Sequence, residues 1–163
     1  MGKTAFLFPG QGSQYVGMAK DFADADPEIR ELVGRADAAL GIPLSEICFS
    51  GPEDRLKQTE YTQPAIFLHS IIVARNVRHL KPDMVAGHSL GEYSALVVAG
   101  AMEFLDALRL VRLRGELMQK AGTDNRGTMA AVMGMSPEQV EDCCRAAADA
   151  GIVQPANYNS PGQ

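Results

Sequence analysis

The sequence has little of what marks a membrane or nucleic-acid-binding protein. No apolar run approaches the roughly 20 residues that span a bilayer, so we expect no membrane insertion. Acidic residues outnumber basic ones by 20 to 15, for a formal net charge of -5. This balance argues against nucleic acid as the main partner. It still allows a single local arginine to bind an acidic small molecule.

Cysteine is also scarce. The three residues are Cys48, Cys143 and Cys144, an odd number, and the last two are adjacent on an expected helix, where they point about 100° apart. We therefore expect reduced thiols in a cytoplasmic protein rather than a disulfide framework. No zinc-ligand spacing occurs, so no metal site is expected. The N-terminus lacks the apolar core and cleavage site of a signal peptide.

Strand-like and helix-like segments alternate along the chain, which predicts an α/β fold with a mostly parallel sheet. Apolar runs predict strands at 5–8, 84–86, 128–135 and from 152. Helical periodicity and capping patterns predict helices at 27–40, from 53, and at 62–79, 92–99, 103–121 and 137–151, with another ending near residue 23. A polar turn at 123–127 suggests a boundary, with a core at 1–125 and the start of a smaller subdomain at 126–163.

A G-x-S-x-G pattern, Gly87-His88-Ser89-Leu90-Gly91, follows the second expected strand and precedes a helix. This context is that of a nucleophile elbow in an α/β-hydrolase-like core, where a strained turn lifts the serine hydroxyl out of the packed interior. Side chains at the flanking glycines would clash across the turn. Ser89 is thus the candidate nucleophile, and the Leu90 N–H is the candidate first donor of an oxyanion hole. The alternative is a serine in an ordinary tight turn or helix cap.

A glycine-rich turn, Pro9-Gly10-Gln11-Gly12-Ser13-Gln14, follows the first strand. Its spacing does not match a dinucleotide-binding fingerprint. Loops that follow the strands of a parallel sheet share one edge, so the Gln11 loop and the Ser89 elbow should meet. The backbone N–H of Gln11 could then complete the oxyanion hole. Taken alone, the segment is an ordinary glycine turn.

Arg114 occupies an unusual helical position. At 100° per residue along 104–120, it falls on the apolar side with Phe104, Leu108 and Val111, whereas Arg112 falls on the polar face. Burying a guanidinium without an anion is costly. The alternatives are a structural ion pair with an internal acid and capture of a substrate carboxylate through two hydrogen bonds. Gly115 beside it would leave room for an approaching group.

The three histidines are given structural interpretations on position alone. His88 is more consistent with stabilising the turn than with acting as the base, because neighbouring side chains on a sharp elbow diverge. His69 and His79 lie within or near the end of an expected helix. The methionines are expected to fill the core.

Four motifs, in order along the chain, resemble bacterial malonyl-CoA–acyl carrier protein transacylases and the acyltransferase domains of polyketide and fatty acid synthases. They are the Gln11 turn, the elbow continued as Glu92-Tyr93-Ser94-Ala95, Arg114-Gly115 with Met118-Gln119, and Asn157-Tyr158-Asn159-Ser160-Pro161-Gly162-Gln163. The resemblance implies transfer of malonyl from malonyl-CoA to the phosphopantetheine thiol of acyl carrier protein through an acyl-serine, without a cofactor.

The resemblance also implies residue roles. Ser89 would be the nucleophile, Gln11 and Leu90 the oxyanion hole, and Arg114, His88 and Asn159 substrate-binding residues. The segment around Asn159 would belong to a ferredoxin-like subdomain beside the cleft. The activating histidine of the family would lie beyond Gln163, because none of the three histidines here matches it.

Three functions remain in contention at this point. The first is the malonyltransferase of fatty acid biosynthesis, with the acyltransferase domain of a polyketide synthase as a variant. The second is an inactive or truncated fragment, or a binding module, with no acyl adduct. The third is a serine hydrolase, disfavoured by a buried arginine and the lack of a lipase-like oxyanion loop.

Overall fold

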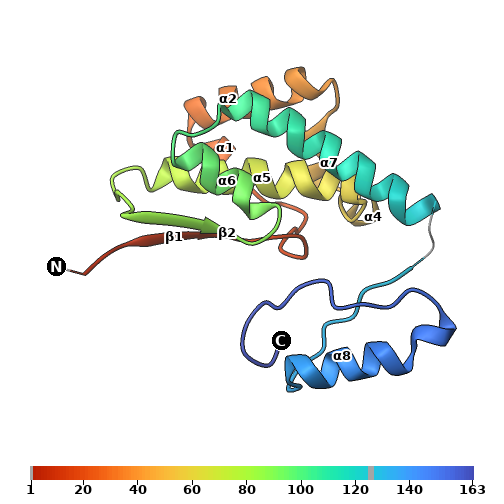
Figure 1. Ribbon diagram of the computed structural model, residues 1–163. Helices are drawn as coiled ribbons and strands as arrows, with labels where there is room; N and C mark the ends of the chain where they lie inside the picture. Colours follow the sequence, from red (N-terminus) through yellow and green to blue (C-terminus); the bar gives the residue numbers. More distant parts are fainter. Residues whose placement is uncertain (1, 125–126) are drawn as a thin grey trace. The chain divides into compact units, whose positions relative to one another are not determined.

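The computed structural model describes residues 2–124 and 127–163 and divides into two compact units, Met1–Asn125 and Arg126–Gln163 (Figure 1). The larger unit carries both strands and most of the helices. Its elements, in chain order, are β1 (Ala5–Phe8), α1 (Lys20–Ala25), α2 (Pro27–Leu40), α3 (Leu44–Ser50), α4 (Glu53–Leu56), α5 (Thr59–Asn76), β2 (Met84–Gly87), α6 (Gly91–Val98) and α7 (Phe104–Asp124).

The two strands form a small parallel sheet. Ala5 pairs with Met84 at one end and Phe8 with Gly87 at the other, so the carboxyl ends of β1 and β2 are level. The helices of the larger unit lie on one side of this sheet (Figure 1). The predicted α/β class with a parallel sheet is therefore confirmed, and the loops that leave both strands start from the same edge.

Helix α2 shows why the capping patterns were informative. The Asp26 carboxylate accepts a hydrogen bond from the Glu28 N–H at 2.8 Å, and Pro27 occupies the first helical position. Gly41 ends the helix in the left-handed region, at a φ of 64°. These local interactions do not depend on the rest of the fold, so the expected helix at 27–40 is confirmed.

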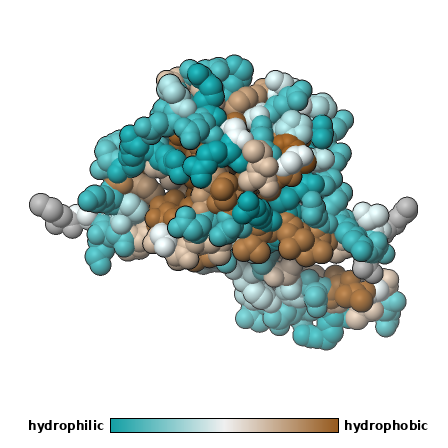
Figure 2. All heavy atoms as spheres, turned by 90° about the horizontal axis from the view of Figure 1, so that it is seen from above, coloured by the Kyte–Doolittle hydropathy of each residue, from teal (hydrophilic) through white to brown (hydrophobic). Residues whose placement is uncertain are grey.

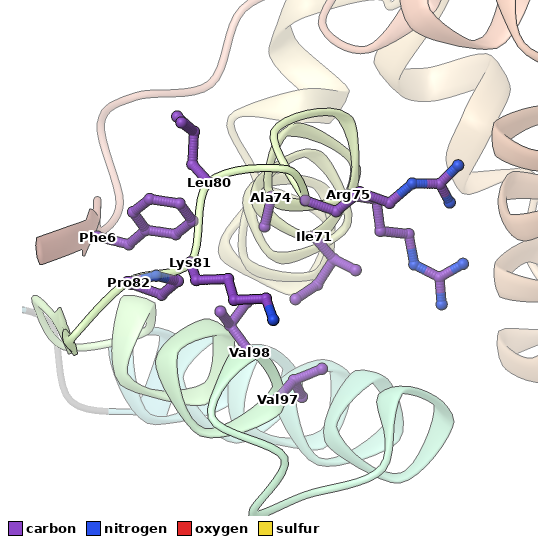
Figure 3. A pocket seen from close by; sticks show the side chains of 10 residues that line it. Phe6, Ile71, Ala74, Arg75, Leu80, Lys81, Pro82, Val97 and Val98 are labelled. Atoms are coloured by element: carbon purple, nitrogen blue, oxygen red, sulfur yellow. The ribbon is translucent and has the colours of Figure 1, made fainter. Parts of the chain in front are cut away.

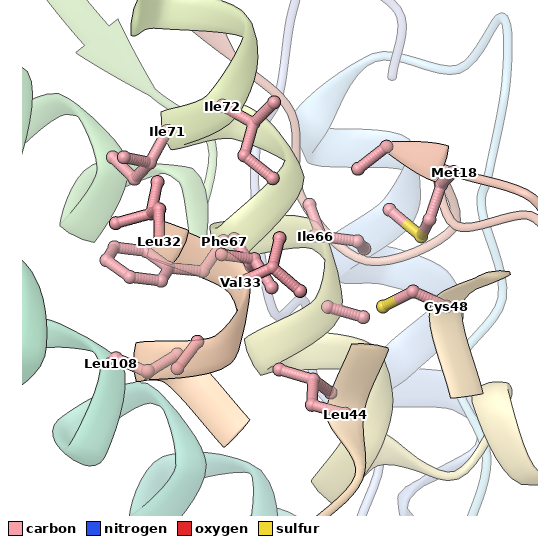
Figure 4. Close-up of a cluster of buried hydrophobic side chains, with 14 of the residues drawn as sticks. Met18, Leu32, Val33, Leu44, Cys48, Ile66, Phe67, Ile71, Ile72 and Leu108 are labelled. Atoms are coloured by element: carbon pink, nitrogen blue, oxygen red, sulfur yellow. The ribbon is translucent and has the colours of Figure 1, made fainter. Parts of the chain in front are cut away.

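Helix α5 is central, as its apolar circumference predicted, and the core is built around it. Phe67, Ile66 and Ile72 are buried between α2, α3 and α7 (Figure 4). Phe67 also stacks on Phe104, with ring centroids 5.8 Å apart. The remaining members of this cluster include Met18, Leu32, Val33, Leu44, Cys48, Ile71 and Leu108. Figure 4 shows these side chains converging from several helices.

The start of α5 differs from the prediction. The helix begins at Thr59, not Thr62, and encloses Pro64. Proline has no N–H to donate to the carbonyl four residues earlier, so the Glu60 carbonyl loses its helical partner. Arg112 of α7 supplies the replacement, donating to that carbonyl at 2.7 Å. A contact between two helices therefore permits a proline where the sequence pattern suggested a helix start.

Two other boundaries were wrong, and one helix was missed. α5 ends at Asn76, before His79, and α3 was missed because it is short and has no side-chain hydrogen bond at its N-cap Pro43. The helix expected directly after the glycine-rich turn begins only at Lys20.

The smaller unit contains α8 (Pro137–Ala146) and a 3-10 turn (Ala148–Ala150). A reciprocal capping box joins Ser136 and Gln139 at the start of α8. The strands expected at 128–135 and from Ile152 are wrong: both segments are irregular. A strand requires a ladder of backbone hydrogen bonds, whereas within residues 127–163 the segment 128–135 makes a single one, from the Gly134 N–H to the Gly162 carbonyl at 2.7 Å. The helix also ends earlier than expected, at Ala146 rather than Gly151.

Two hollows of about 350 and 370 Å³ lie beside β1 and α5. The first is lined by Phe6, Leu80 and Val97 together with Arg75 and Lys81 (Figure 3). Neither includes the candidate nucleophile. Figure 2 shows hydrophobic side chains exposed among hydrophilic ones on the molecular surface. Among the described helices, none is long and apolar enough to cross a membrane.

Candidate active site

The elbow after β2 has the strained geometry expected of it. Ser89 has a φ of 55°, in the left-handed region that non-glycine residues rarely adopt, and its side chain is exposed. Hydrogen bonds on either side hold the turn. The His88 N–H donates to the Phe8 carbonyl at 3.0 Å, and the Gly91 N–H donates to the His88 carbonyl at 2.9 Å. The predicted strand–turn–helix context of Ser89 is confirmed.

Both flanking glycines are required by close backbone approach. A Cβ built on Gly87 would overlap the backbone of Gly91, across the turn. A Cβ built on Gly91 would overlap the carbonyl of Phe8 on the neighbouring strand. The two glycines of the G-x-S-x-G pattern are therefore required because any side chain there would overlap the backbone, as predicted.

The glycine-rich loop after β1 meets the elbow, as the parallel sheet predicted. Gly10 lies so close to His88 that an added Cβ would be 2.8 Å from the ring Nδ1 and 2.9 Å from the carbonyl oxygen. The exposed Gln11 side chain contacts α5, where its Nε2 donates to the Thr59 hydroxyl at 3.3 Å. The loop is further closed by the Ser13 hydroxyl, which donates to the Gly10 carbonyl at 2.9 Å.

The backbone donors proposed for the oxyanion hole are uncommitted. Within residues 2–124 and 127–163, neither the Gln11 N–H nor the Leu90 N–H has a protein acceptor. Leu90 is itself buried at the N-terminus of α6, where free N–H groups favour an anion. Their role in catalysis stays a prediction.

Arg114 reaches the candidate nucleophile. Its Nη2 donates to the Ser89 hydroxyl at 2.9 Å, and its Nη1 donates to the Gln63 side-chain oxygen at 2.6 Å. Both partners are neutral, and none of the ion pairs among the described residues includes Arg114. The alternative of a structural ion pair is thus wrong for this part of the chain. Within the described residues, Arg114 is therefore a cation without a counter-ion beside the candidate nucleophile.

Arg112, two residues earlier on α7, has the opposite environment. It pairs with Glu60 at 2.8 Å and Glu116 at 2.6 Å, and its guanidinium lies over the Tyr61 ring. Its pairing with Glu116 agrees with the polar face on which the sequence placed it, but only 15% of its side chain is exposed. The helical wheel of α7 alone does not show this burial, because α5 packs along α7 and covers this side.

Gly115 has a packing role instead of the predicted one. A Cβ there would lie 2.8 Å from the Thr59 carbonyl oxygen and 3.0 Å from the Glu60 Cα. The group that approaches Gly115 is therefore the backbone of α5, not a substrate. This close crossing brings Arg114 and Gln63 within hydrogen-bond distance.

Gln63 is the residue that the sequence reasoning missed. Its side chain is fully buried on α5, and its amide nitrogen donates to the Met118 sulfur at 3.1 Å. A buried amide requires partners, so the unusual polarity of Gln63 in an apolar helix was the signal available.

The remaining predicted residues are distributed as follows. His69 is half-buried, and burial lowers the pKa of its imidazole; its ring contacts Tyr15 and Phe22 edge-on. Asn159 lies in the smaller unit, where its N–H donates to the Gln163 carbonyl at 3.0 Å. The substrate-binding roles of His88 and Asn159 stay predictions.

The cysteines have no site of their own. All three are free thiols, and burial, followed by the charge of Asp37, raises the pKa of Cys48 to about 12. Among the described residues, no cluster of three or more histidine, cysteine or acidic side chains could hold a metal ion.

Residues 5–163 match the family described as "Acyl transferase domain". The chain belongs to this acyl transferase domain family. It is 46% identical over 166 residues to the malonyl CoA-acyl carrier protein transacylase of Escherichia coli, covering all of this chain and 54% of that protein. A Staphylococcus aureus protein of the same name is 43% identical, again over all of this chain and 53% of its own length.

Solved structures agree with this assignment of the acyl transferase domain. The MCAT of Streptococcus pneumoniae superposes with a TM-score of 0.89 at 48% identity, covering 98% of this chain and 53% of its own. A malonyl-transacylase in complex with a type II PKS acyl-carrier protein gives a TM-score of 0.86 at 40% identity, covering 99% of this chain and 53% of its own. The chain thus spans about half the length of the relatives that it matches.

Proposed function

We propose that this chain carries the nucleophile and the carboxylate-binding arginine of an acyl carrier protein S-malonyltransferase. The observation that carries the proposal is the hydrogen bond of 2.9 Å from Arg114 to the Ser89 hydroxyl. It places Arg114, a cation without a counter-ion among the described residues, within hydrogen-bond distance of the elbow serine. In a malonyl thioester, one methylene group separates the electrophilic carbonyl from the carboxylate. The carbonyl can therefore face the Ser89 hydroxyl while the carboxylate meets the Arg114 guanidinium.

The transfer proceeds in two steps, acylation of Ser89 and transfer to the carrier protein. Ser89 Oγ attacks the thioester carbonyl of malonyl-CoA, the C–S bond breaks, and coenzyme A leaves as its thiol. The hydroxyl proton passes to a general base and from there to the departing thiolate. The phosphopantetheine thiol of acyl carrier protein then attacks the serine ester, the C–O bond breaks, and the malonyl group stays on the carrier thiol, while the base passes the thiol proton to Ser89 Oγ. No cofactor takes part.

The N–H groups of Gln11 and Leu90 stabilise the negative oxygen of each tetrahedral intermediate. Their lack of protein acceptors within the described residues supports this role. Preorganised donors of this kind contribute about 3 kcal/mol each to the transition state. His88 and Asn159 complete the substrate-binding set in this proposal.

The same proposal covers the finer fold and the location. The two-stranded sheet with its elbow is part of an α/β-hydrolase-like core, and residues 126–163 belong to a ferredoxin-like subdomain. The three free thiols support a reducing, cytoplasmic location.

A polyketide carrier protein is a second candidate acceptor. It is favoured by the relative solved in complex with a type II PKS acyl-carrier protein. The acyl-serine step is common to both acceptors, so supplying each carrier protein to the loaded enzyme separates them.

The test is the intact mass of the chain after incubation with malonyl-CoA or acetyl-CoA. We expect an adduct from malonyl-CoA that Ser89→Ala abolishes. Ser94→Ala is the matched control, because the Ser94 hydroxyl is buried on α6 without a hydrogen-bond partner among the described residues. No adduct, or an adduct that survives Ser89→Ala, would contradict the proposal for this chain.

A further inference from the structure

Two arginines of α7 contact α5, and their partners on α5 differ in charge. Arg112 meets the carboxylate of Glu60 at 2.8 Å and that of Glu116 on its own helix at 2.6 Å. Arg114 meets the amide of Gln63 at 2.6 Å. The first cation is neutralised by its partners, and the second keeps its full charge.

Gln63 is positioned to hold Arg114 without neutralising it. Its side chain has no exposed surface, so the orientation of its amide is determined by internal contacts. The guanidinium can only donate, so the amide oxygen faces Arg114, and the amide nitrogen faces the Met118 sulfur at 3.1 Å. Both ends of the amide are therefore assigned to partners on α7.

The guanidinium is oriented by this contact. Nη1 is held by Gln63, which leaves Nη2 directed at the Ser89 hydroxyl at 2.9 Å. A planar guanidinium is rigid, so anchoring one Nη sets the direction of the other. A carboxylate that enters the site meets a cation whose orientation is already determined and whose charge is available.

We propose that Gln63 is a positioning and specificity-determining residue: its neutral amide anchors Arg114 toward Ser89 while leaving the arginine's charge free for the substrate carboxylate. The specificity role of Gln63 rests on the malonyl transfer proposed above. Its positioning part concerns Arg114 alone and holds or fails independently of the reaction.

Two substitutions separate orientation from charge. In Gln63→Met the new side chain is about as long as that of glutamine but is apolar. It accepts no hydrogen bond from Arg114, so the guanidinium is released. Gln63→Glu keeps the acceptor and adds a charge that neutralises Arg114. Gln58→Glu is the matched control for the added charge, because Gln58 is exposed at the N-cap of the same helix.

The positioning part is read from the ¹⁵N NMR signals of the arginine side chains in the full chain. Hindered rotation should resolve the Nη signals of both Arg112 and Arg114 in the unsubstituted protein. In Gln63→Met we expect those of Arg114 to merge while those of Arg112 stay resolved. Arg114 signals that remain resolved in Gln63→Met would overturn the positioning role, and unchanged Arg112 signals show that the fold is retained.

The specificity part is read from the rates of Ser89 acylation by malonyl-CoA and acetyl-CoA. Losing one charge-assisted hydrogen bond lowers the malonyl preference about tenfold, so we expect at least that loss in Gln63→Glu and none in Gln58→Glu. An unchanged preference in Gln63→Glu would overturn the specificity role. If the unsubstituted chain showed no malonyl preference while Gln63→Met still released Arg114, the proposed function would fail and the positioning role would stand.

Discussion

Replacing Arg114 by alanine tests the carboxylate clamp most directly. The substitution removes the hydrogen bonds to Ser89 at 2.9 Å and Gln63 at 2.6 Å and, with them, a cation that has no counter-ion among the described residues. Malonyl-CoA and acetyl-CoA share the thioester and differ in the distal carboxylate. The ratio of their acylation rates therefore isolates the contribution of the guanidinium.

The magnitude follows from the two donors of the guanidinium fork. A hydrogen bond between charged groups contributes about 1.5–3 kcal/mol, and the partial exposure of Arg114 favours the lower value. Two such bonds to the carboxylate amount to about 3 kcal/mol, or about a hundredfold in rate. We expect the malonyl preference to fall by this factor, with acetyl transfer unchanged or faster.

The assay measures acylation of Ser89 by intact mass over a range of thioester concentrations, to obtain kcat/KM for each substrate. Arg112→Ala is the matched control, since it removes the same side chain from the same helix. Arg112 is paired with Glu60 and Glu116, so its loss should lower the stability and preserve the preference. A preference retained in Arg114→Ala, or lost equally in Arg112→Ala, would refute the clamp.

Three further predictions concern packing, pH and thiol accessibility. Gly91→Ala should lower the free energy of unfolding by more than about 2 kcal/mol, because the added Cβ overlaps the Phe8 carbonyl. Gly34→Ala is the control: Gly34 has open space around it on α2, so this substitution should raise the free energy of unfolding by about 0.5–1 kcal/mol. Thermal unfolding of the two variants measures both changes. The pKa of Cys48, raised by burial to about 12, means that the unfolded thiol ionises first, so the contribution of Cys48 to stability should decline between pH 9 and about 12. Alkylation at pH 8 should modify the exposed Cys143 and spare Cys48 until denaturant is added, and equal labelling of the two would contradict this burial.

The sequence predicted most reliably those features that depend on short-range sterics. The elbow at Ser89 needs glycine on both sides because the backbone turns back on itself within five residues, and this requirement is written directly into the pattern. Helix α2 was located by its caps, Asp26 and Gly41, for the same reason. Such features need no knowledge of distant residues.

Features that depend on partners far along the chain were missed or wrong. Residues 128–135 have the composition of a strand, yet they are irregular because the described part of the smaller unit offers no second strand. α5 starts before its proline because Arg112, 52 residues away from Glu60, takes the carbonyl that Pro64 leaves unpaired. Periodicity within one segment cannot report such a replacement.

The sequence by itself determined the α/β class, the elbow at Ser89 and the unusual position of Arg114, because each follows from local backbone geometry or from the period of one helix. The tertiary structure alone decided which arginine keeps its charge. Arg112 and Arg114 differ by two positions on α7, and only the packing of α5, with Glu60 against one and Gln63 against the other, makes the first an ion pair and leaves the second a cation directed at Ser89.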